Sequence, residues 1–445
     1  MAQNHPAQPK SVLRGHRTQV HATAFIRGNQ RLASGDVEGH VVLWDLTIMR
    51  PRAVWRAHTN AILGIADWGD NRIITHGRDN RLIVWKLDAQ DEITMSTALP
   101  LDESVPGRPQ PWILHILEVN TMNFCSFASC DTGPGATDDE LLIAVPNTLQ
   151  TEAVDIFQLP SQTRQHTIGL GGKTEKQGMV MSLSLFWLQE HLTLIGAYES
   201  GLTVVARLGR SETWDILYRA QVHTQPVLSL DVAPDKDFFL TSGADAILAK
   251  HPIPTPMDLS IQEPRTSKWE ESENKKVPDP SILSSALRSG PPPAPPLKKQ
   301  DLIIETQALK TINTKHSGQQ GLRIRSDGKI FATAGWDSKV RVYSTKTLTE
   351  LAVLKWHEVG CYAVAFMALL EGQSLDETKR NNRSVNATEE SENHVAINDS
   401  RDNTTVALPK LGQLSVKDRR IKMAKEAHWL AAGSKDGKIS LWDIY

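Results

Sequence analysis

The sequence predicts an all-β fold: a seven-bladed WD40 β-propeller, closed by pairing of its N- and C-terminal strands and carrying two long disordered insertions. Gly-His at 15–16 and Trp-Asp at 442–443 open and close a repeat of the WD type. Such a repeat spans about 40 to 45 residues and folds as the four strands of one blade. Because the two signatures stand near opposite ends of the chain, we expect the ends to meet in one sheet.

Seven copies of the repeat are recognisable. Four are well marked, at 15–45, 57–86, 315–343 and 356–443, the last across a long insertion. The third copy ends at 154–157 with Phe157 in place of tryptophan, and the fourth ends at 202–205 with no aromatic residue. The fifth has the markers His223, Thr241 and Asp245, with His251 in the tryptophan position.

Each marked blade should contain a hydrogen-bonded network. It joins a histidine before the first strand, a serine or threonine, a carboxylate six residues before the tryptophan, and the indole N–H. Such a network is stable only if every buried polar group finds a partner. In the first copy the carboxylate position holds Glu38, with Asp36 nearby, which predicts an adapted network. The expected network residues are His16, His58, Thr75, Asp79, Trp85, His316, Asp337, His357, Asp436 and Trp442.

One propeller domain is expected over residues 10–445. In this topology the strand before each histidine belongs to the previous blade, so residues 10–14 would complete the last one. Seven repeats need roughly 280 to 300 residues, and the chain has 445, so the remainder must be insertions. Residues 252–300 are rich in proline and predict a linker with polyproline II character, either a spacer or a ligand for SH3 or WW domains. Residues 371–408, an acidic and polar stretch, predict a second disordered insertion.

The repeat topology also predicts two unlike faces. Both insertions, and the loops 88–108 and 128–139, should open on the face opposite the histidine-bearing turns. On the histidine-bearing face only 169–178 should rise, which leaves that face comparatively clean. The residue before each turn carboxylate should lie on the clean face: these are Val37, Arg78, Ala244, Trp336 and Lys435. We predict Arg78, Trp336 and Lys435 as partner-binding residues, since exposed tryptophan and arginine are typical of interface hot spots. The alternative is that Trp336 packs on a neighbouring loop.

Nothing in the composition or motifs favours catalysis, a cofactor, a metal, nucleic acid or a membrane. The formal net charge is −2, and no apolar run reaches the 18 residues of a membrane span. The three cysteines, Cys125, Cys130 and Cys361, suit neither a disulfide framework nor a zinc site. The glycine-rich 169–174 resembles a phosphate-binding loop, but Thr167 replaces its first glycine and a strand follows. We therefore expect a protein that is not an enzyme.

Several stretches resemble the fungal ASTRA-associated protein 1 family of WD proteins. They are AILGIADW at 61–68, ITHGRD at 74–79, KHSGQQGLRIR at 315–325, AGWD at 334–337 and AAGSKDGKISLWD at 431–443. The likeness covers both ends and most blades, and it is weakest in the insertions and in blades three and four.

The resemblance implies a non-catalytic scaffold subunit of a nuclear ASTRA-type complex, linked to chromatin remodelling and to maturation of phosphatidylinositol-3-kinase-related kinases. The implied partners are kinase-maturation chaperone adaptors, RuvB-like ATPases and a transcriptional-cofactor pseudokinase, with the propeller monomeric within this assembly. The implied location is the nucleus, with the cytoplasm as a second place. Two alternatives stay open: a substrate receptor of a ubiquitin ligase, and a Gβ-like scaffold, for whose coiled-coil helix residues 1–10 are too short.

Overall fold

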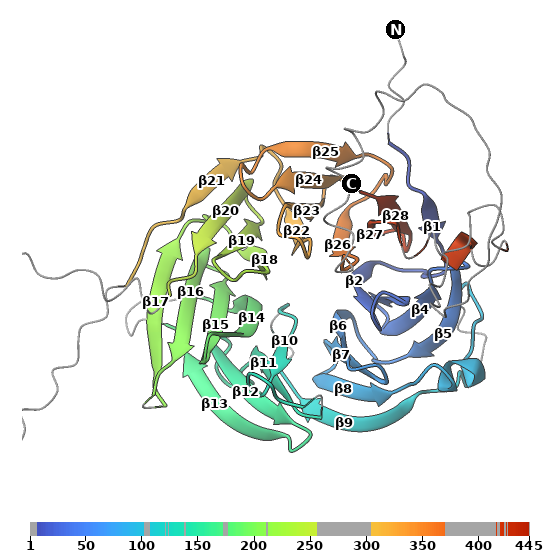
Figure 1. Cartoon of the computed structure of the whole chain (residues 1–445), viewed down its shortest axis with the longest axis horizontal. Coiled ribbons are helices and arrows are strands. Elements are labelled where there is room, and N and C mark those ends of the chain that lie inside the picture. Colours follow the sequence, from blue (N-terminus) through green and yellow to red (C-terminus); the bar gives the residue numbers. More distant parts are fainter. Residues whose placement is uncertain are drawn as a thin grey trace, which may run out of the picture.

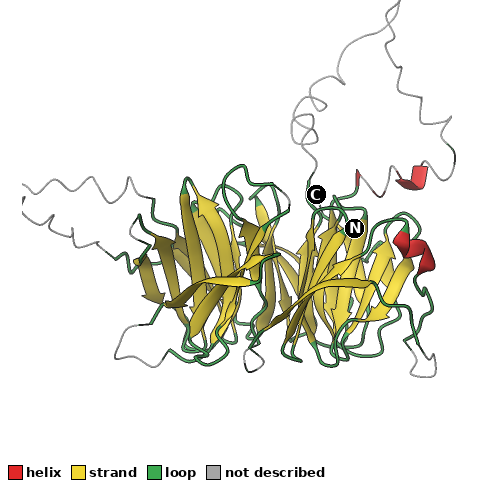
Figure 2. Cartoon of the chain, turned by 90° about the horizontal axis from the view of Figure 1, so that it is seen from below, coloured by secondary structure: helices red, strands yellow, loops and turns green. Residues whose placement is uncertain are grey.

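A computed structural model of the chain shows a ring of seven four-stranded antiparallel sheets around a central channel (Figure 1). Viewed from the side, the strands run between two faces of a disc (Figure 2). The structure describes residues 7–101, 107–120, 122, 124–137, 139–171, 177–210, 212–255, 304–369, 415, 419–421, 424 and 426–444. The predicted seven-bladed β-propeller is confirmed.

Each blade contributes four strands, which follow one another from the channel outward. Blades one to three comprise β2 (Val20–Ile26), β3 (Arg31–Asp36), β4 (His40–Asp45), β5 (Arg50–Arg56); β6 (Ile62–Trp68), β7 (Arg72–Gly77), β8 (Arg81–Lys86), β9 (Trp112–Glu118); and β10 (Ala128–Asp131), β11 (Leu141–Pro146), β12 (Ala153–Leu159), β13 (Thr163–Gly169). Blades four and five comprise β14 (Val180–Leu188), β15 (His191–Tyr198), β16 (Leu202–Leu208), β17 (Trp214–Gln221); and β18 (Val227–Val232), β19 (Phe238–Gly243), β20 (Ile247–Pro252), β21 (Lys310–Asn313). Blades six and seven comprise β22 (Gln319–Ile324), β23 (Ile330–Gly335), β24 (Val340–Ser344), β25 (Glu350–Leu354); and β26 (Cys361–Phe366), β27 (Trp429–Ser434), β28 (Ile439–Asp443), β1 (Ser11–Leu13).

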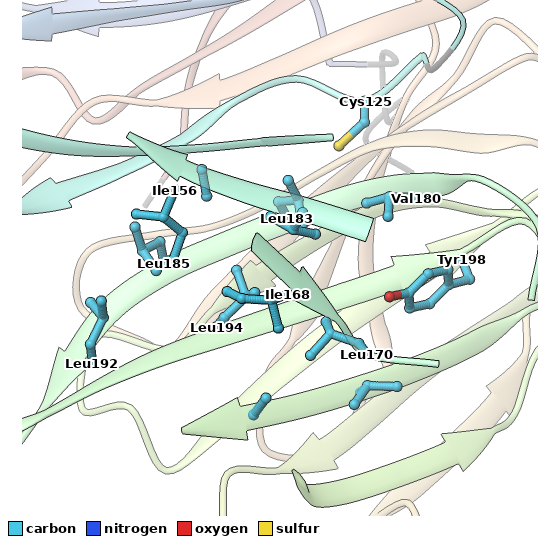
Figure 3. Close-up of a cluster of buried hydrophobic side chains, with 14 of the residues drawn as sticks. Cys125, Ile156, Ile168, Leu170, Val180, Leu183, Leu185, Leu192, Leu194 and Tyr198 are labelled. Atoms are coloured by element: carbon cyan, nitrogen blue, oxygen red, sulfur yellow. The ribbon is translucent and has the colours of Figure 1, made fainter. Parts of the chain in front are cut away.

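Apolar packing between neighbouring blades holds the ring together. The second strands β11, β19, β23 and β27 are buried at every residue, because a blade covers each of their faces. This explains their nearly continuous apolar sequences. Blades three and four lack a WD signature, yet they share one such cluster, in which Ile156, Leu183 and Leu194 meet (Figure 3). Apolar packing therefore joins these two blades as well, although neither carries the WD signature.

The ring closes as predicted, with the N-terminal strand β1 completing blade seven. Ser11 lies opposite Leu441 and Leu13 opposite Ile439 in an antiparallel pair. The Lys10 N–H extends the ladder by donating to the Leu441 carbonyl at 2.8 Å. Leu13 is 2% exposed and joins the cluster between blades seven and one.

Two kinds of turn make up one face, which we call the histidine face. They are the turns that lead into the innermost strand of a blade and the turns between its second and third strands. In Figure 2 this face is below, because the end of β28, near the label C, lies above. Gly437 shows how tightly successive blades meet there: its φ is +77°, and a Cβ would lie 2.2 Å from the His16 carbonyl oxygen. The opposite side is called the insertion face.

Both long insertions start on the insertion face, as predicted. One separates β20 from β21, and the other separates β26 from β27. The base of the second contacts two loops of the same face: Asn29 Nδ2 donates to the Ala368 carbonyl at 2.7 Å, and the Leu369 N–H donates to Ser326 Oγ at 2.8 Å. The predicted disorder of 252–300 and 371–408 concerns residues that, apart from 252–255, lie outside the described part of the chain.

Our prediction that the loop 88–108 opens on the insertion face is wrong for most of its described residues. The loop begins there, but its described residues cross the outside of blade one toward the histidine face. We call residues 87–101 the strap. The Leu101 N–H donates to the Gly15 carbonyl at 3.0 Å, and Leu99 lies against Gly15, where an added Cβ would be 2.5 Å away. The strap thus covers the closing seam between blades seven and one.

A buried carboxylate anchors the strap. Glu92, in the short 3₁₀ helix η1 (Asp91–Thr94), has no exposed side-chain surface. Arg27 donates to it, Arg31 Nη2 lies 2.9 Å from Glu92 Oε2, and Arg52 Nε lies 3.6 Å away. Arg27 also donates to the Leu87 carbonyl. Three arginines of blade one therefore hold a loop of blade two.

A second prediction is also wrong: only 169–178 was expected to rise on the histidine face, but residues 119–127 lie there too. This segment joins β9 to β10 and therefore belongs to that face. Its described part exposes Met122 by 66% and Phe124 by 56%. Both side chains add apolar surface close to the predicted docking residues.

Candidate functional site

Blade two contains the complete predicted network. His58 Nδ1 donates to Asp79 Oδ1 at 2.8 Å, and His58 Nε2 lies 2.8 Å from Thr75 Oγ1. The Trp85 indole N–H donates to the same hydroxyl at 2.8 Å. Burial alone would raise the pKa of Asp79, but the hydrogen bonds from His58 and the Thr59 N–H lower it to about 2. The network ties the turns of the histidine face to the interior of the blade.

Blade one has the same network, but its carboxylate is Asp36 and not Glu38. His16 Nδ1 donates to Asp36 Oδ2 at 2.8 Å, and His16 Nε2 lies 2.7 Å from Ser34 Oγ. Asp36 is the last residue of β3 and is fully buried, whereas Glu38 lies two residues further along the turn, where its side chain is 42% exposed. Because Asp36, at the end of β3, already lies beside His16, it joins the network. The six-residue spacing to the tryptophan therefore does not determine which carboxylate is used.

Blade six departs from the predicted network. The His316 side chain is 42% exposed, and its Nδ1 lies 3.7 Å from Asp337. Gln319 takes the buried place instead, where its Oε1 accepts a hydrogen bond from Thr333 Oγ1 at 2.6 Å. Asp337 binds the guanidinium of Arg341, whose side chain is 2% exposed, at 2.6 Å. The role of Asp337 is therefore to neutralise a buried arginine.

Blade seven has a partial network. His357 Nε2 lies 2.8 Å from Ser440 Oγ, and the Trp442 indole N–H donates to the same oxygen at 2.8 Å. Asp436 pairs with Lys438 at 2.5 Å rather than with His357. The Nδ1 atom of His357 is buried and has no partner among the described residues. Burial accordingly lowers the pKa of His357 to about 4, although the nearby charge of Asp436 opposes that shift.

In the weakly marked blades four and five, other residues occupy some positions of the network. In blade five His223 binds Asp245 at 2.9 Å and Thr241 at 2.8 Å, and His251 stands 2.8 Å from Thr241 in the tryptophan position, as its sequence pattern predicts. Tyr218, which the sequence did not single out, completes that chain at 2.7 Å from His251 Nδ1. In blade four the corresponding turn carboxylate is Glu199, another residue missed at the sequence level, which accepts from the Met179 N–H at 3.2 Å.

A buried histidine in blade two makes stability sensitive to acid. His76 is 1% exposed, and neither ring nitrogen has a partner among the described residues. Burial, with a smaller contribution from His58, lowers its pKa from 6.5 to about 3. The unfolded chain therefore takes up a proton near pH 6.5 while the folded chain does not, so stability is complete above that pH and is lost below it.

Replacing His76 with leucine should remove that acid-dependent loss. Between about pH 7.5 and about pH 5, the variant should lose about 2 kcal/mol less free energy of unfolding than the parent. Urea denaturation at both pH values measures the difference. His316→Leu is the control, because the His316 side chain is 42% exposed. Equal acid sensitivity of the parent and the His76 variant would contradict the assignment.

The predicted arc of docking residues occupies equivalent positions around the histidine face. Each of Val37, Arg78, Trp336 and Lys435 follows a second strand and donates its N–H to the turn that enters the same blade, at 2.9 to 3.0 Å. Lys435 is exposed. Trp336 is 48% exposed, with its ring over Gly318 and its indole N–H donating to Gln320 Oε1 at 2.7 Å. Trp336 thus both packs on a neighbouring turn and faces solvent.

The central channel opens inside this arc and is lined by a recurring irregularity. Six innermost strands carry a β-bulge at the same place, two residues into the strand. A bulge inserts one unpaired residue and redirects its side chain. The inserted residues all line a cavity of about 310 Å³, and we call them the bulge ring: His21, Leu63, Met181, Leu228, Gln320 and Tyr362.

Other kinds of site are not found in the described part of the chain. There, no group of three or more histidine, cysteine or acidic side chains could hold a metal ion. Cys125 and Cys361 are buried free thiols, and burial raises the pKa of both. Among the described helices, none has the length and apolarity needed to cross a membrane.

Fold and polar networks together define the class: the chain is a WD-repeat β-propeller. The family model described as ASTRA-associated protein 1 matches residues 9–442. Proteins of that name are 49% identical in Pyricularia oryzae, over 99% of this chain and 98% of theirs, and 50% identical in Verticillium alfalfae, over 98% and 93%. One from Schizosaccharomyces pombe is 33% identical, over 80% and 93%. The chain belongs to the ASTRA-associated protein 1 family.

Proposed function

We propose that this chain is a non-catalytic scaffold subunit of a nuclear ASTRA-type complex that contributes to chromatin remodelling and to maturation of phosphatidylinositol-3-kinase-related kinases. Its partners in this proposal are kinase-maturation chaperone adaptors, RuvB-like ATPases and a transcriptional-cofactor pseudokinase. The propeller enters the assembly as one copy and acts by docking. The name shared by its relatives supports association with ASTRA.

The observation that carries the docking proposal is the exposed apolar surface of the histidine face. Five large side chains there are more than a third exposed: Met122, Phe124, Leu149, Trp336 and Val359. Large apolar side chains exposed on a rigid face can mark an interaction surface. Hydrogen bonds hold the turns that carry them: the Leu149 N–H donates to Asn147 Oδ1 at 2.8 Å, and the Trp336 N–H donates to the Gly318 carbonyl at 3.0 Å.

Replacing Trp336 with alanine should lower the recovery of partner proteins without unfolding the ring. A central interface tryptophan contributes on the order of 2 kcal/mol or more to binding, which corresponds to roughly thirtyfold in affinity. The measurement is affinity purification of the tagged full chain from its own cells, with partners quantified by mass spectrometry. Trp112→Ala is the matched control, because Trp112 is 74% exposed on the outer strand β9, away from the histidine face.

The outcomes separate the possible functions. Loss of chaperone adaptors and RuvB-like ATPases with the Trp336 variant alone supports the proposal. Loss with Trp112→Ala alone would place docking on the rim of blade two. Recovery of cullin adaptors by the parent protein would favour a ubiquitin-ligase substrate receptor instead, and recovery of G-protein signalling components would favour the Gβ-like scaffold.

A further inference from the structure

The bulge ring forms a lined entrance to the channel that the fold alone does not require. Its members project one per blade from blades one, two, four, five, six and seven, and all six are half-buried. Leu63, Met181 and Leu228 make one side apolar. His21, Gln320 and Tyr362 make the other side polar, and the rings of His21 and Tyr362 meet edge to face at 5.1 Å. A cavity of about 310 Å³ with two such sides suits an amphipathic segment of chain.

A preorganised cation stands at the same entrance. The Arg78 guanidinium lies over the Phe124 ring, 4.3 Å from its centroid, and Phe124 also lines the cavity. Arg78 Nε is buried and has no hydrogen-bond partner among the described residues. Arg78 is close enough to His21 to help burial lower the pKa of that imidazole. A guanidinium held on an aromatic ring can donate two parallel hydrogen bonds from its terminal nitrogens to a carboxylate.

The charge around the entrance is one-sided. In the histidine-face turns of blades six, seven, one and two, five cations are exposed, against two carboxylates with exposed side chains, Glu38 and Glu358. The cations are Arg14, Arg17, Lys315, Lys355 and Lys435. No described carboxylate lies within 4.0 Å of Lys315, Lys355 or Lys435. The turn carboxylates are already bound within their own blades, Asp79 by His58, Asp337 by Arg341 and Asp436 by Lys438.

We propose that the bulge ring and Arg78 bind an acidic peptide segment of a protein partner, which enters the channel mouth from the histidine face. One carboxylate of the segment pairs with Arg78, and an adjacent apolar side chain lies against Phe124 and the Leu63 side of the ring. Trp336 and Lys435 border the remainder of the segment. This inference rests on the proposed docking function and specifies the chemistry of what docks.

The surface favours a peptide over nucleic acid. A nucleic-acid site tracks many phosphates along a continuous basic path and depends on that charge for most of its affinity. Here the cations surround a small entrance, while Met122, Phe124, Leu149 and Val359 expose apolar surface that a phosphate backbone would not use. The apolar half of the bulge ring likewise suits an aliphatic or aromatic side chain.

The test selects ligands from a library of short random peptides displayed on phage, using the full chain as target. A selected peptide is then labelled and titrated by fluorescence anisotropy. We expect selected sequences enriched in aspartate or glutamate next to an apolar residue. Arg78→Gln should weaken binding roughly tenfold or more, and Arg78→Lys should weaken it less. Lys86→Gln, which removes an exposed cation at the insertion-face end of β8, should leave binding unchanged.

Three results would overturn the inference: selection of peptides that are not acidic, failure to select any, or equal affinity of the Arg78→Gln variant. Tighter binding of a single-stranded oligonucleotide than of any peptide would assign the entrance to nucleic acid instead. Thermal unfolding of each variant shows whether it folds, and Tyr362→Phe provides a second ring variant that retains the packing. If partner recovery depends on Trp336 but peptide affinity does not depend on Arg78, the proposed docking function is supported. Only the inference that the docked segment is acidic is then contradicted.

Discussion

Replacing Glu92 with glutamine is expected to lower the free energy of unfolding by about 3 to 5 kcal/mol, as breaking a buried ion pair does. The carboxylate has no exposed surface and faces Arg27, Arg31 and Arg52. Glutamine has nearly the same shape but no charge, so Arg27, with a side chain only 6% exposed, would remain buried without compensation. Urea denaturation of the two full chains measures the loss.

The strap offers a matched control within the same helical turn. Asp91, next to Glu92, is exposed, and Asp91→Asn should change stability by less than about 0.5 kcal/mol. Limited proteolysis adds a local measurement, since a released strap should be cut between residues 87 and 101 before the blades unfold. A Glu92→Gln protein as stable as the Asp91 variant would show that apolar contacts alone hold the strap.

Removing residues 1–13 should leave a chain that no longer behaves as a stable monomer. The deletion takes away β1, exposes the edge of β28 and removes the buried Leu13 side chain. Loss of a buried leucine alone costs about 3 kcal/mol, and each lost ladder hydrogen bond adds about 1 kcal/mol. An unpaired strand edge next to apolar surface also invites association. Size-exclusion chromatography and thermal unfolding provide the measurement.

A shorter deletion is the control for this prediction. Removing residues 1–8 leaves Lys10, whose N–H bonds to Leu441, and all of β1 in place. That protein should elute and unfold like the parent. A monomeric, equally stable chain lacking residues 1–13 would mean that the other three strands of blade seven close the ring sufficiently by themselves.

The fold could be predicted because local sequence patterns in each repeat determine where its turns and strands lie. His58, Thr75, Asp79 and Trp85 stand at the spacing that one blade imposes, and they make the expected hydrogen bonds. The equivalence of Arg78 and Trp336 follows from the same spacing, because each precedes a turn carboxylate. Local patterns thus determined the blade number, the closure and the place of the insertions.

The rest depends on contacts between residues that are distant in sequence. Spacing selected Glu38 and His316, but burial selected Asp36 and Gln319, and only the packed blade distinguishes them. The path of the strap depends on arginines about 40 to 65 residues away from Glu92. The bulge ring is equally hidden, because residues as unlike as His21 and Leu63 share a position that only strand pairing reveals. Phe124 was missed for the same reason.

Closure of blade seven also has a consequence for biosynthesis. Ser11 leaves the ribosome well before its strand partner Leu441, which is made about 430 residues later. At translation rates of about 5 to 20 residues per second, β1 waits tens of seconds for β28. During that interval the apolar faces of blades one and seven, including Leu13 and Trp44, lack their final cover. The nascent chain therefore presents to chaperones the seam that the finished ring encloses.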